Sequence, residues 1–196
     1  MIYPIGVCLL ITCFYTGYFM KQILLRKKGI HTNRLAKGRK PSKTSAVETA
    51  LLAATYGIAV IQYASVFFSR FLLTLSFPVC VRRIGIALTG GGVIFFILAI
   101  LSMRDSWRAG VDETQKTSIV TGGIYKVSRN PAFVGFDMLY LGTALALPNL
   151  ILLVASVIGI LLLHFQILEE EKYLPRAFGD EYWQYRNRTP RYFLFF

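Results

Sequence analysis

The sequence predicts an all-α integral membrane protein, built as one bundle of five transmembrane helices. Hydrophobic residues make up 55% of the chain and charged residues only 16%, a composition that excludes an ordinary soluble domain. The apolar residues also fall in runs long enough to cross the roughly 30 Å hydrocarbon layer of a bilayer. The predicted spans, all within a single membrane domain of residues 1–196, are residues 2–20, 46–69, 84–101, 132–147 and 150–168.

The last two spans are predicted to form a helical hairpin. Residues 132–168 contain no Lys or Arg, and Pro148-Asn149 interrupts them near the middle. Proline cannot continue a helix and asparagine favours a turn, so we expect two antiparallel helices. At about 1.5 Å per residue these helices are roughly 24 and 28 Å long. Folding about the turn brings Arg129 and the acidic residues 169–171 to one face of the membrane.

The positive charge orients the chain in the membrane. Most of the Lys and Arg residues behind the net charge of +12 lie in residues 21–43, 102–131 and 169–196. By the positive-inside rule, the N-terminus is expected outside and the C-terminus in the cytoplasm. Because the charge is explained by orientation, no nucleic-acid partner is expected. Trp107 is expected at the membrane interface, where tryptophan is enriched.

This orientation predicts a multi-pass protein of the bacterial inner membrane or the endoplasmic reticulum. Residues 102–131 and 169–196 would then be the cytoplasmic segments that carry the active site. The three cysteines have no metal-ligand or redox spacing, so no metal is expected. Gly90-Gly91-Gly92 lacks the following lysine of a phosphate loop, and we interpret it as a site of close helix packing.

The start of the fourth span has the features of an anion site. Asn130 is a favourable helix cap, and Pro131 suits the first helical position, where its missing N–H costs nothing. The free N–H groups that follow, strengthened by Arg129, can bind an anion. The alternative is an ordinary capped helix whose arginine reaches the membrane surface.

The end of the fifth span carries three consecutive acids, Glu169-Glu170-Glu171. They oppose the helix dipole and repel one another, so a cation is expected nearby. That cation is either part of a ligand or a neighbouring side chain, Lys172 or Arg176. An anion site facing carboxylates suits a zwitterion with an added positive charge, such as S-adenosylmethionine.

Asp137 and His164 are the acidic and basic side chains inside the hairpin. Such residues are costly in lipid and usually face an interior cavity. With Pro148-Asn149 as the pivot, they lie about one helical turn apart. They form either a hydrogen-bonded structural pair or part of the catalytic site, where a hydroxyl or ammonium acceptor would need a general base. The catalytic candidates are therefore Arg129, which would orient a carboxylate or phosphate, Asp137 and His164.

Several motifs in the last 80 or so residues resemble those of the isoprenylcysteine carboxyl methyltransferase family. They are Ile119-Val120-Thr121-Gly122-Gly123-Ile124-Tyr125, Arg129-Asn130-Pro131-Ala132-Phe133-Val134-Gly135, Glu169-Glu170-Glu171, and Phe178-Gly179-Asp180-Glu181-Tyr182 with Tyr185. The family consists of membrane-embedded, S-adenosylmethionine-dependent methyltransferases related to phospholipid N-methyltransferases.

The resemblance implies a cofactor site and a place for the substrate. The implied cofactor-binding residues are Thr117, Ser118, Ile119, Val120, Tyr125, Asn130, Pro131, Ala132, Phe133 and Glu170. Two positions within this set depart from the family pattern, since Asn130 replaces a histidine and Phe133 a tyrosine. Gln166 is the implied substrate-binding residue, at a position where eukaryotic members carry a substrate-contacting arginine. This difference argues against a prenylcysteine carboxylate as the acceptor.

The expected function is S-adenosylmethionine-dependent methylation of a lipophilic acceptor taken from the bilayer. The acceptor group is a carboxylate, a hydroxyl or an amine, carried by a lipophilic small molecule or a lipidated substrate. Membrane lipids are the other expected partners, and the sequence carries no signal for an oligomeric state. Two alternatives remain, an NADPH-dependent membrane reductase of the sterol-reductase type and a non-catalytic scaffold or small transporter.

Overall fold

The protein is described here from a computed structural model, which covers residues 2–32, 35–37, 40–108 and 118–193. Within these residues the chain forms five α-helices and no β-strand, which confirms the predicted helical class. The helices are α1 (Ile2–Lys27), α2 (Ser42–Phe67), α3 (Val79–Met103), α4 (Pro131–Ala146) and α5 (Leu150–Arg188).

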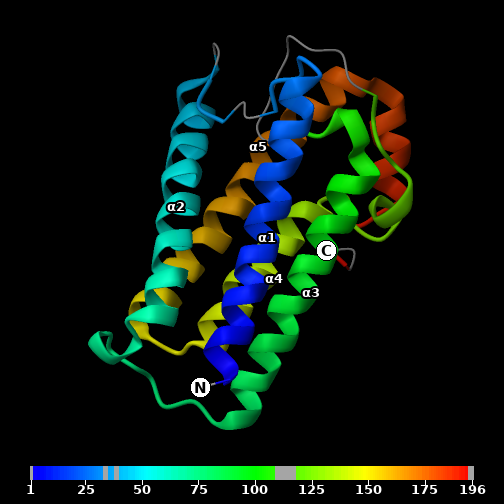
Figure 1. The fold of residues 1–196 in the computed structure, drawn as a ribbon. Coiled ribbons are helices and arrows are strands. Elements are labelled where there is room, and N and C mark those ends of the chain that lie inside the picture. The colour runs from blue at the N-terminus through cyan, green and yellow to red at the C-terminus, as the bar shows by residue number, and fades with distance from the viewer. Residues whose placement is uncertain (1, 33–34, 38–39, 109–117, 194–196) are drawn as a thin grey trace.

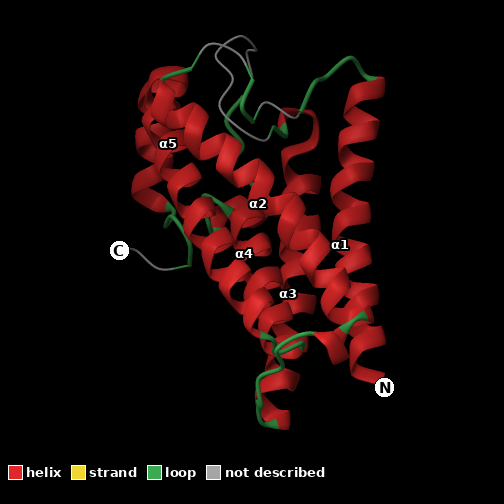
Figure 2. Ribbon diagram, turned by 90° about the vertical axis from the view of Figure 1, so that its left-hand side faces the viewer, coloured by secondary structure: helices red, strands yellow, loops and turns green. Residues whose placement is uncertain are grey.

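The helices run alternately up and down, so their connections gather at two ends of the bundle (Figure 1). The N-terminus, the connection 68–78 and the turn at 147–149 lie at one end. The connection between α1 and α2, the connection between α3 and α4, and the last part of α5 lie at the other. Figure 2 shows that the chain after α5 turns back along the bundle. The two predicted functional segments therefore meet at one end.

Four of the helices, α1, α2, α3 and α5, are long and apolar enough to cross a membrane. The fourth helix in the chain, α4, has 16 apolar residues and is shorter. Large apolar side chains are exposed along the outer faces of the long helices, such as Ile94 on α3 and Leu161 on α5. A surface of this kind is stable in contact with lipid, as expected for an integral membrane protein.

The four long helices extend beyond the predicted spans, since α1 continues to Lys27 and α2 begins at Ser42. α3 begins at Val79, directly after Pro78, and its first turns include Arg82 and Arg83. The prediction excluded these arginines from the span, but Arg82 stacks over the Tyr3 ring at 5.8 Å and remains within the helix. α5 continues to Arg188, well beyond residue 168 where the predicted span ends, with non-helical backbone at Gly179 (φ 54°, ψ −132°).

The predicted turn between α4 and α5 is confirmed, and Asn149 holds it in place. The Asn149 Oδ1 atom accepts a hydrogen bond from the Leu152 N–H at 2.9 Å, which caps α5. Its Nδ2 atom donates to the Ser65 hydroxyl at 2.9 Å, which ties the turn to the end of α2. The Leu75 N–H donates to the Pro148 carbonyl at 2.9 Å, so the connection before α3 also packs against this turn.

Glycines bring the backbones of α3 and α4 into contact. A Cβ atom built on Gly92 would lie 2.7 Å from the Gly135 carbonyl oxygen, and one on Gly85 would lie 2.5 Å from the Ala146 nitrogen. One on Gly142 would lie 2.5 Å from the Thr89 nitrogen. The predicted packing role is thus confirmed for Gly92, because no larger residue fits between the two helices.

The glycine contact can be tested with two neighbouring substitutions. Gly92→Ala forces α3 and α4 apart, so we expect the free energy of unfolding to fall by about 1–3 kcal/mol. Gly90→Ala is the matched control, since a Cβ there meets nothing within 4 Å. Thermal unfolding of the purified protein in detergent measures both. Equal unfolding temperatures for the two variants would contradict the close approach of the helices.

Candidate functional site

The three consecutive carboxylates at the end of the hairpin point in three directions. Successive residues of a helix are turned by about 100°, so neighbouring side chains cannot share one face. Glu169 accepts from the Thr44 hydroxyl at 2.7 Å and pairs with Lys172 at 2.5 Å. Glu170 accepts from the Gln166 Nε2 atom at 3.0 Å. The cation expected near Glu169 is therefore supplied by the predicted side chain, Lys172.

Glu171 joins the hairpin to the chain that follows α5. Its carboxylate is 2.7 Å from Arg129 Nη2 and 2.6 Å from Arg191 Nη2. The Glu171 and Arg129 side chains are only 12% and 9% exposed, so this is a buried pair. Hydrogen bonding to the Glu171 carboxylate raises the pKa of Arg191 further above its usual value. Arg129 and the acidic run do converge, as the hairpin predicts, but they bind one another directly.

The start of α4 uses its polar residues differently from the prediction. Asn130 occupies the cap position, but its side chain makes no capping hydrogen bond. Its Nδ2 atom instead donates to the Arg191 carbonyl at 3.1 Å. Arg129 donates through Nη1 to the Thr189 carbonyl at 2.7 Å, at the C-terminal end of α5, where a cation is favourable. The predicted capping by Asn130 is thus wrong, whereas Pro131 does occupy the first turn.

A small cavity of about 180 Å³ lies beside this junction. It is lined by residues from the end of α3, the segment before α4, the start of α4 and the last part of α5. They are Met103, Ser106, Trp107, Arg108, Ser118, Ile119, Val120, Tyr125, Arg129, Asn130, Ala132, Phe133, Glu170, Glu171, Tyr173, Leu174, Phe178, Tyr182 and Tyr185.

Aromatic side chains make up much of the small cavity's wall. Tyr125 lies in the short 3-10 helix η3 (Gly123–Lys126) and is 6% exposed. The Tyr185 hydroxyl donates to the Tyr125 carbonyl at 2.7 Å, which holds α5 against η3. Burial raises the pKa of the Tyr125 phenol, so it stays protonated and uncharged at neutral pH. The cavity therefore offers ring faces together with the Glu170 carboxylate.

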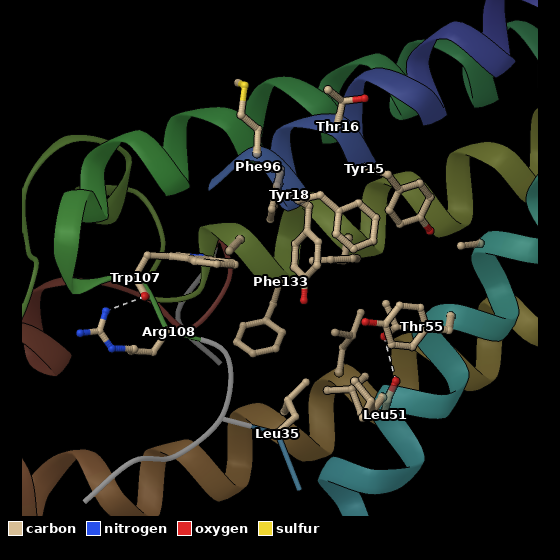
Figure 3. Close-up of a pocket in the computed structure, with 18 of the residues that line it drawn as sticks. Tyr15, Thr16, Tyr18, Leu35, Leu51, Thr55, Phe96, Trp107, Arg108 and Phe133 are labelled. Atoms are coloured by element: carbon tan, nitrogen blue, oxygen red, sulfur yellow. Dashed lines mark hydrogen bonds between the residues drawn. The ribbon is translucent and has the colours of Figure 1, made fainter. Parts of the chain in front are cut away.

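A large cavity of about 780 Å³ lies between α1, α2, α4 and α5. Most of its lining is apolar or aromatic. Figure 3 shows Trp107 and Arg108 at one end of it and Tyr15, Thr55 and Leu51 at the other. It is lined by Thr12, Tyr15, Thr16, Tyr18, Phe19, Met20, Ile23, Leu24, Lys27, Leu35, Leu51, Leu52, Thr55, Tyr56, Ala59, Tyr63, Phe96, Trp107, Arg108, Ala132, Phe133, Phe136, Leu163, Gln166 and Glu170.

The large cavity reaches the outer surface between α1 and α2. Met20 and Ile23 on α1 and Tyr56 on α2 line it, and these side chains are 55%, 56% and 49% exposed. Hydrogen bonds connect the helices further along, where the Tyr15 hydroxyl donates to Gln62 Oε1 at 2.8 Å. Gln62 Nε2 in turn donates to the Thr143 hydroxyl of α4 at 2.9 Å. The cavity is thus open toward the apolar surface of the bundle.

The two cavities share part of their walls. The residues that line both are Trp107, Arg108, Ala132, Phe133 and Glu170. A molecule in the small cavity and one in the large cavity would therefore contact some of the same side chains. Trp107 is only 4% exposed and packs edge-on against Tyr18, with ring centroids 5.7 Å apart. The Trp107 ring is therefore buried in the shared wall, and its position at the membrane interface stays a prediction.

Most of the cofactor-binding residues implied by the sequence surround the small cavity. Thr117 lies outside the described residues. Ser118, Ile119, Val120, Tyr125, Asn130, Ala132, Phe133 and Glu170 line the cavity. Pro131 is buried beside it and does not line it. Gln166, the implied substrate residue, lines the large cavity, and no described residue is a hydrogen-bond partner of its buried Oε1 atom.

Asp137 and His164 line neither cavity. His164 Nδ1 instead lies 2.7 Å from the hydroxyl of Tyr192, in the chain after α5. Burial, and secondly the negative charge of Asp137, raise the pKa of Tyr192 to about 12. Tyr192 therefore contacts His164 directly and is influenced by the charge of Asp137. The predicted hydrogen-bonded pair of Asp137 and His164 is therefore not formed, and among the described residues the buried Asp137 Oδ1 atom has no hydrogen-bond partner.

Sequence reasoning missed several residues of the site. Trp107 and Arg108 come from the segment after α3, which carries no motif that assigns them a role. Tyr173, Phe178 and Tyr182 line the small cavity from the last part of α5. Helical periodicity does not place these three residues on one face, and non-helical backbone at Gly179 separates Tyr182 from the other two. No local pattern therefore indicates that they meet at the cavity.

Comparisons with known proteins agree with this geometry. Residues 81–181, about half of the chain, match the family model described as phospholipid methyltransferase. A stretch of 73 residues is 41% identical to the protein-S-isoprenylcysteine O-methyltransferase of Schizosaccharomyces pombe, covering 37% of this chain. The match spans 31% of that relative's length. The predicted relationship to the isoprenylcysteine carboxyl methyltransferase family is therefore confirmed.

The burial of the Glu171 pair can be tested through stability. Glu171→Gln leaves two guanidinium groups beside a neutral side chain, so we expect the free energy of unfolding to fall by about 3 kcal/mol. Glu169→Gln is the comparison variant. The Glu169 side chain is itself only 7% exposed, but its partner Lys172 is 60% exposed, and a glutamine can still accept from the Thr44 hydroxyl, so we expect a smaller loss of under about 1 kcal/mol. Denaturant unfolding in detergent micelles measures both changes. A larger loss for the Glu169 variant would show that the assignment of the buried pair is incorrect.

Proposed function

The chain belongs to the phospholipid methyltransferase family, and on this premise we propose that it is a membrane-embedded S-adenosylmethionine-dependent methyltransferase that acts on a lipophilic acceptor. The observation that carries the proposal is the pair of cavities with a shared wall. A group transfer between two molecules needs both reactants held side by side. Here a small cavity with a carboxylate and aromatic rings adjoins a larger apolar one.

The residues around the small cavity fit S-adenosylmethionine. When bound, this cofactor supplies an electrophilic methyl group on a sulfonium. Glu170 would bind its ammonium group, because a carboxylate in a partly buried site pairs with a cation. The backbone N–H groups after Pro131, at the start of α4, would face its carboxylate. Tyr125 and Phe133 would contact the purine ring and the sulfonium, as aromatic faces attract both.

The large cavity would hold the acceptor. Its apolar lining suits an acyl or prenyl chain, and its opening between α1 and α2 would admit one from the bilayer. At its inner end, the unpartnered Gln166 Oε1 atom would accept a hydrogen bond from the acceptor's head group. A glutamine cannot neutralise a carboxylate, so this position favours a hydroxyl or amine acceptor. The isoprenylcysteine substrate named for the yeast relative is accordingly not carried over to this chain.

The structural partners of Arg129 and His164 shape the proposed mechanism. Arg129 would stabilise the start of α4 through its ion pair with Glu171, in place of binding substrate. His164 would hold the chain after α5 against the hairpin through its contact with Tyr192. Rate enhancement would then come mainly from alignment of the methyl donor and acceptor in a site that excludes water.

We further propose that α4 crosses the membrane as the inner helix of five spans. At about 1.5 Å per residue its 16 residues extend roughly 24 Å. By the positive-inside rule, the common end of the two cavities would lie at the cytoplasmic face, with the N-terminus outside. The cofactor would therefore enter from the cytoplasm, and the acceptor from the lipid.

Binding of S-adenosylhomocysteine to the protein in lipid nanodiscs tests the cofactor assignment. We expect binding by calorimetry, and Glu170→Gln should weaken it by about tenfold or more, because the cofactor's ammonium loses its ionic partner. Glu169→Gln should bind as the wild type does, since Glu169 lines neither cavity. NADPH serves as the comparison ligand. Binding of NADPH, with none of S-adenosylhomocysteine, would favour the reductase alternative.

Methyl transfer to lipid tests the role of the large cavity. Membranes incubated with methyl-labelled S-adenosylmethionine should yield a labelled lipid, which mass spectrometry identifies. Ala59→Trp fills the cavity from α2, so labelling should fall by at least about tenfold while cofactor binding is retained. Ala53→Trp, on the exposed side of α2, is the control and should label normally. Equal labelling by both variants would exclude the large cavity as the acceptor site.

A further inference from the structure

The chain after α5 makes a dense set of contacts with the start of α4. The Pro190 carbonyl accepts from the Arg129 N–H at 2.9 Å, so the two segments meet through their backbones. The Arg191 carbonyl accepts from the Ser128 hydroxyl and from Asn130 Nδ2, both at 3.1 Å. We call residues 189–193 the C-terminal clasp. Its backbone carbonyls accept hydrogen bonds from three consecutive residues that lead into α4.

The side chains of the clasp reach further along the hairpin. Arg191 donates to both oxygens of Glu171, through Nε at 3.0 Å and Nη2 at 2.6 Å. Tyr192 contacts His164 of α5, and the Phe193 ring lies edge-on to Phe95 of α3 at 5.3 Å. The clasp therefore fixes the end of the chain to two helices and to the acidic run.

Arg191 does not line either cavity, but its partner does. Glu171 and Arg129 both line the small cavity, and Glu170, next to Glu171 on α5, lines the shared wall. The two-pronged contact of a guanidinium with a carboxylate restricts the orientation of both groups. A change at Arg191 would thus be transmitted to the start of α4 and to Glu170 together.

We propose that Arg191 is a positioning residue for the small cavity: through Glu171 it sets the start of α4 and Glu170 at the separation that the methyl donor requires. This inference rests on the proposed cofactor site. It assigns the residues after α5 a part in ligand binding, although they lie outside both cavities. It also accounts for the pairing of Glu171 with two arginines, since one alone would neutralise its charge.

The test compares Arg191→Gln, Arg191→Lys and the control Arg188→Gln in the full-length protein in lipid nanodiscs. Arg188 is exposed near the end of α5, where its Nε atom donates to the Gln184 carbonyl at 3.1 Å. Two measurements are made on each variant. Calorimetry gives the affinity for S-adenosylhomocysteine, and hydrogen exchange gives the protection of the Arg129 amide, which donates to Pro190.

We expect Arg191→Gln to bind S-adenosylhomocysteine about tenfold more weakly, with faster exchange at the Arg129 amide, because the charged contacts to Glu171 are lost. Arg191→Lys keeps the positive charge but cannot contact both oxygens of Glu171 as the guanidinium does. Its affinity for S-adenosylhomocysteine should therefore lie between those of the wild type and Arg191→Gln. Arg188→Gln should match the wild type in both measurements. This graded rescue would not arise from a residue that affects stability alone.

Wild-type affinity in a folded Arg191→Gln variant, with faster exchange at Arg129, would overturn the positioning role and leave the proposed function intact. Absence of S-adenosylhomocysteine binding in the wild-type protein would overturn both. Should Arg191→Gln fail to fold, Arg191→Lys decides the question. Weakened binding by the lysine variant supports the role, and unchanged binding overturns it.

Discussion

The site depends on one buried carboxylate, that of Glu171, held between Arg129 and Arg191. Two guanidinium groups this close would repel one another in a poorly solvated region, and the carboxylate offsets that repulsion. The same contact joins three parts of the chain that are distant in sequence. Because Glu170 is the next residue along α5, the geometry of both cavities follows from this ionic junction.

The glycine contact between α3 and α4 supplies the second constraint. With no side chains between them at Gly92 and Gly135, the two helices approach closely and act as a single wall. The bulky residues of α3 and α4 then face α1, where Phe14 stacks on Phe96 at 4.3 Å and meets Phe136 edge-on at 4.8 Å. This aromatic layer borders the large cavity. One side of α4 therefore packs tightly against α3, and another side faces the cavity.

The helical hairpin could be predicted from the sequence, because the signals that indicate it are local. Pro148-Asn149 interrupts an apolar run, and an antiparallel pair necessarily brings Arg129 and the acidic run to one end. The direction of each acid was beyond such reasoning, since it depends on the rotation of α5 about its axis. The same pattern of three acids is compatible with Glu169, Glu170 or Glu171 facing the cavity.

Other parts of the site depend on contacts with no local signal. Residues 189–193 follow a helix end and contain nothing that predicts their return to the hairpin. The expected pairing of Asp137 with His164 was sound in its estimate of depth, but the return of the chain places Tyr192 at His164 instead. Nothing in the sequence around Trp107 predicts that its ring is buried, since the burial comes from residues of other helices.

The wall common to both cavities has a thermodynamic consequence. Phe133 and Trp107 line both cavities, so a ligand that shifts these rings alters the free energy of binding in the neighbouring compartment. Linkage requires this influence to be equal in both directions. Occupancy of one compartment would then change the affinity of the other by the same factor as the reverse, so the two molecules would bind with the same cooperativity whichever arrives first.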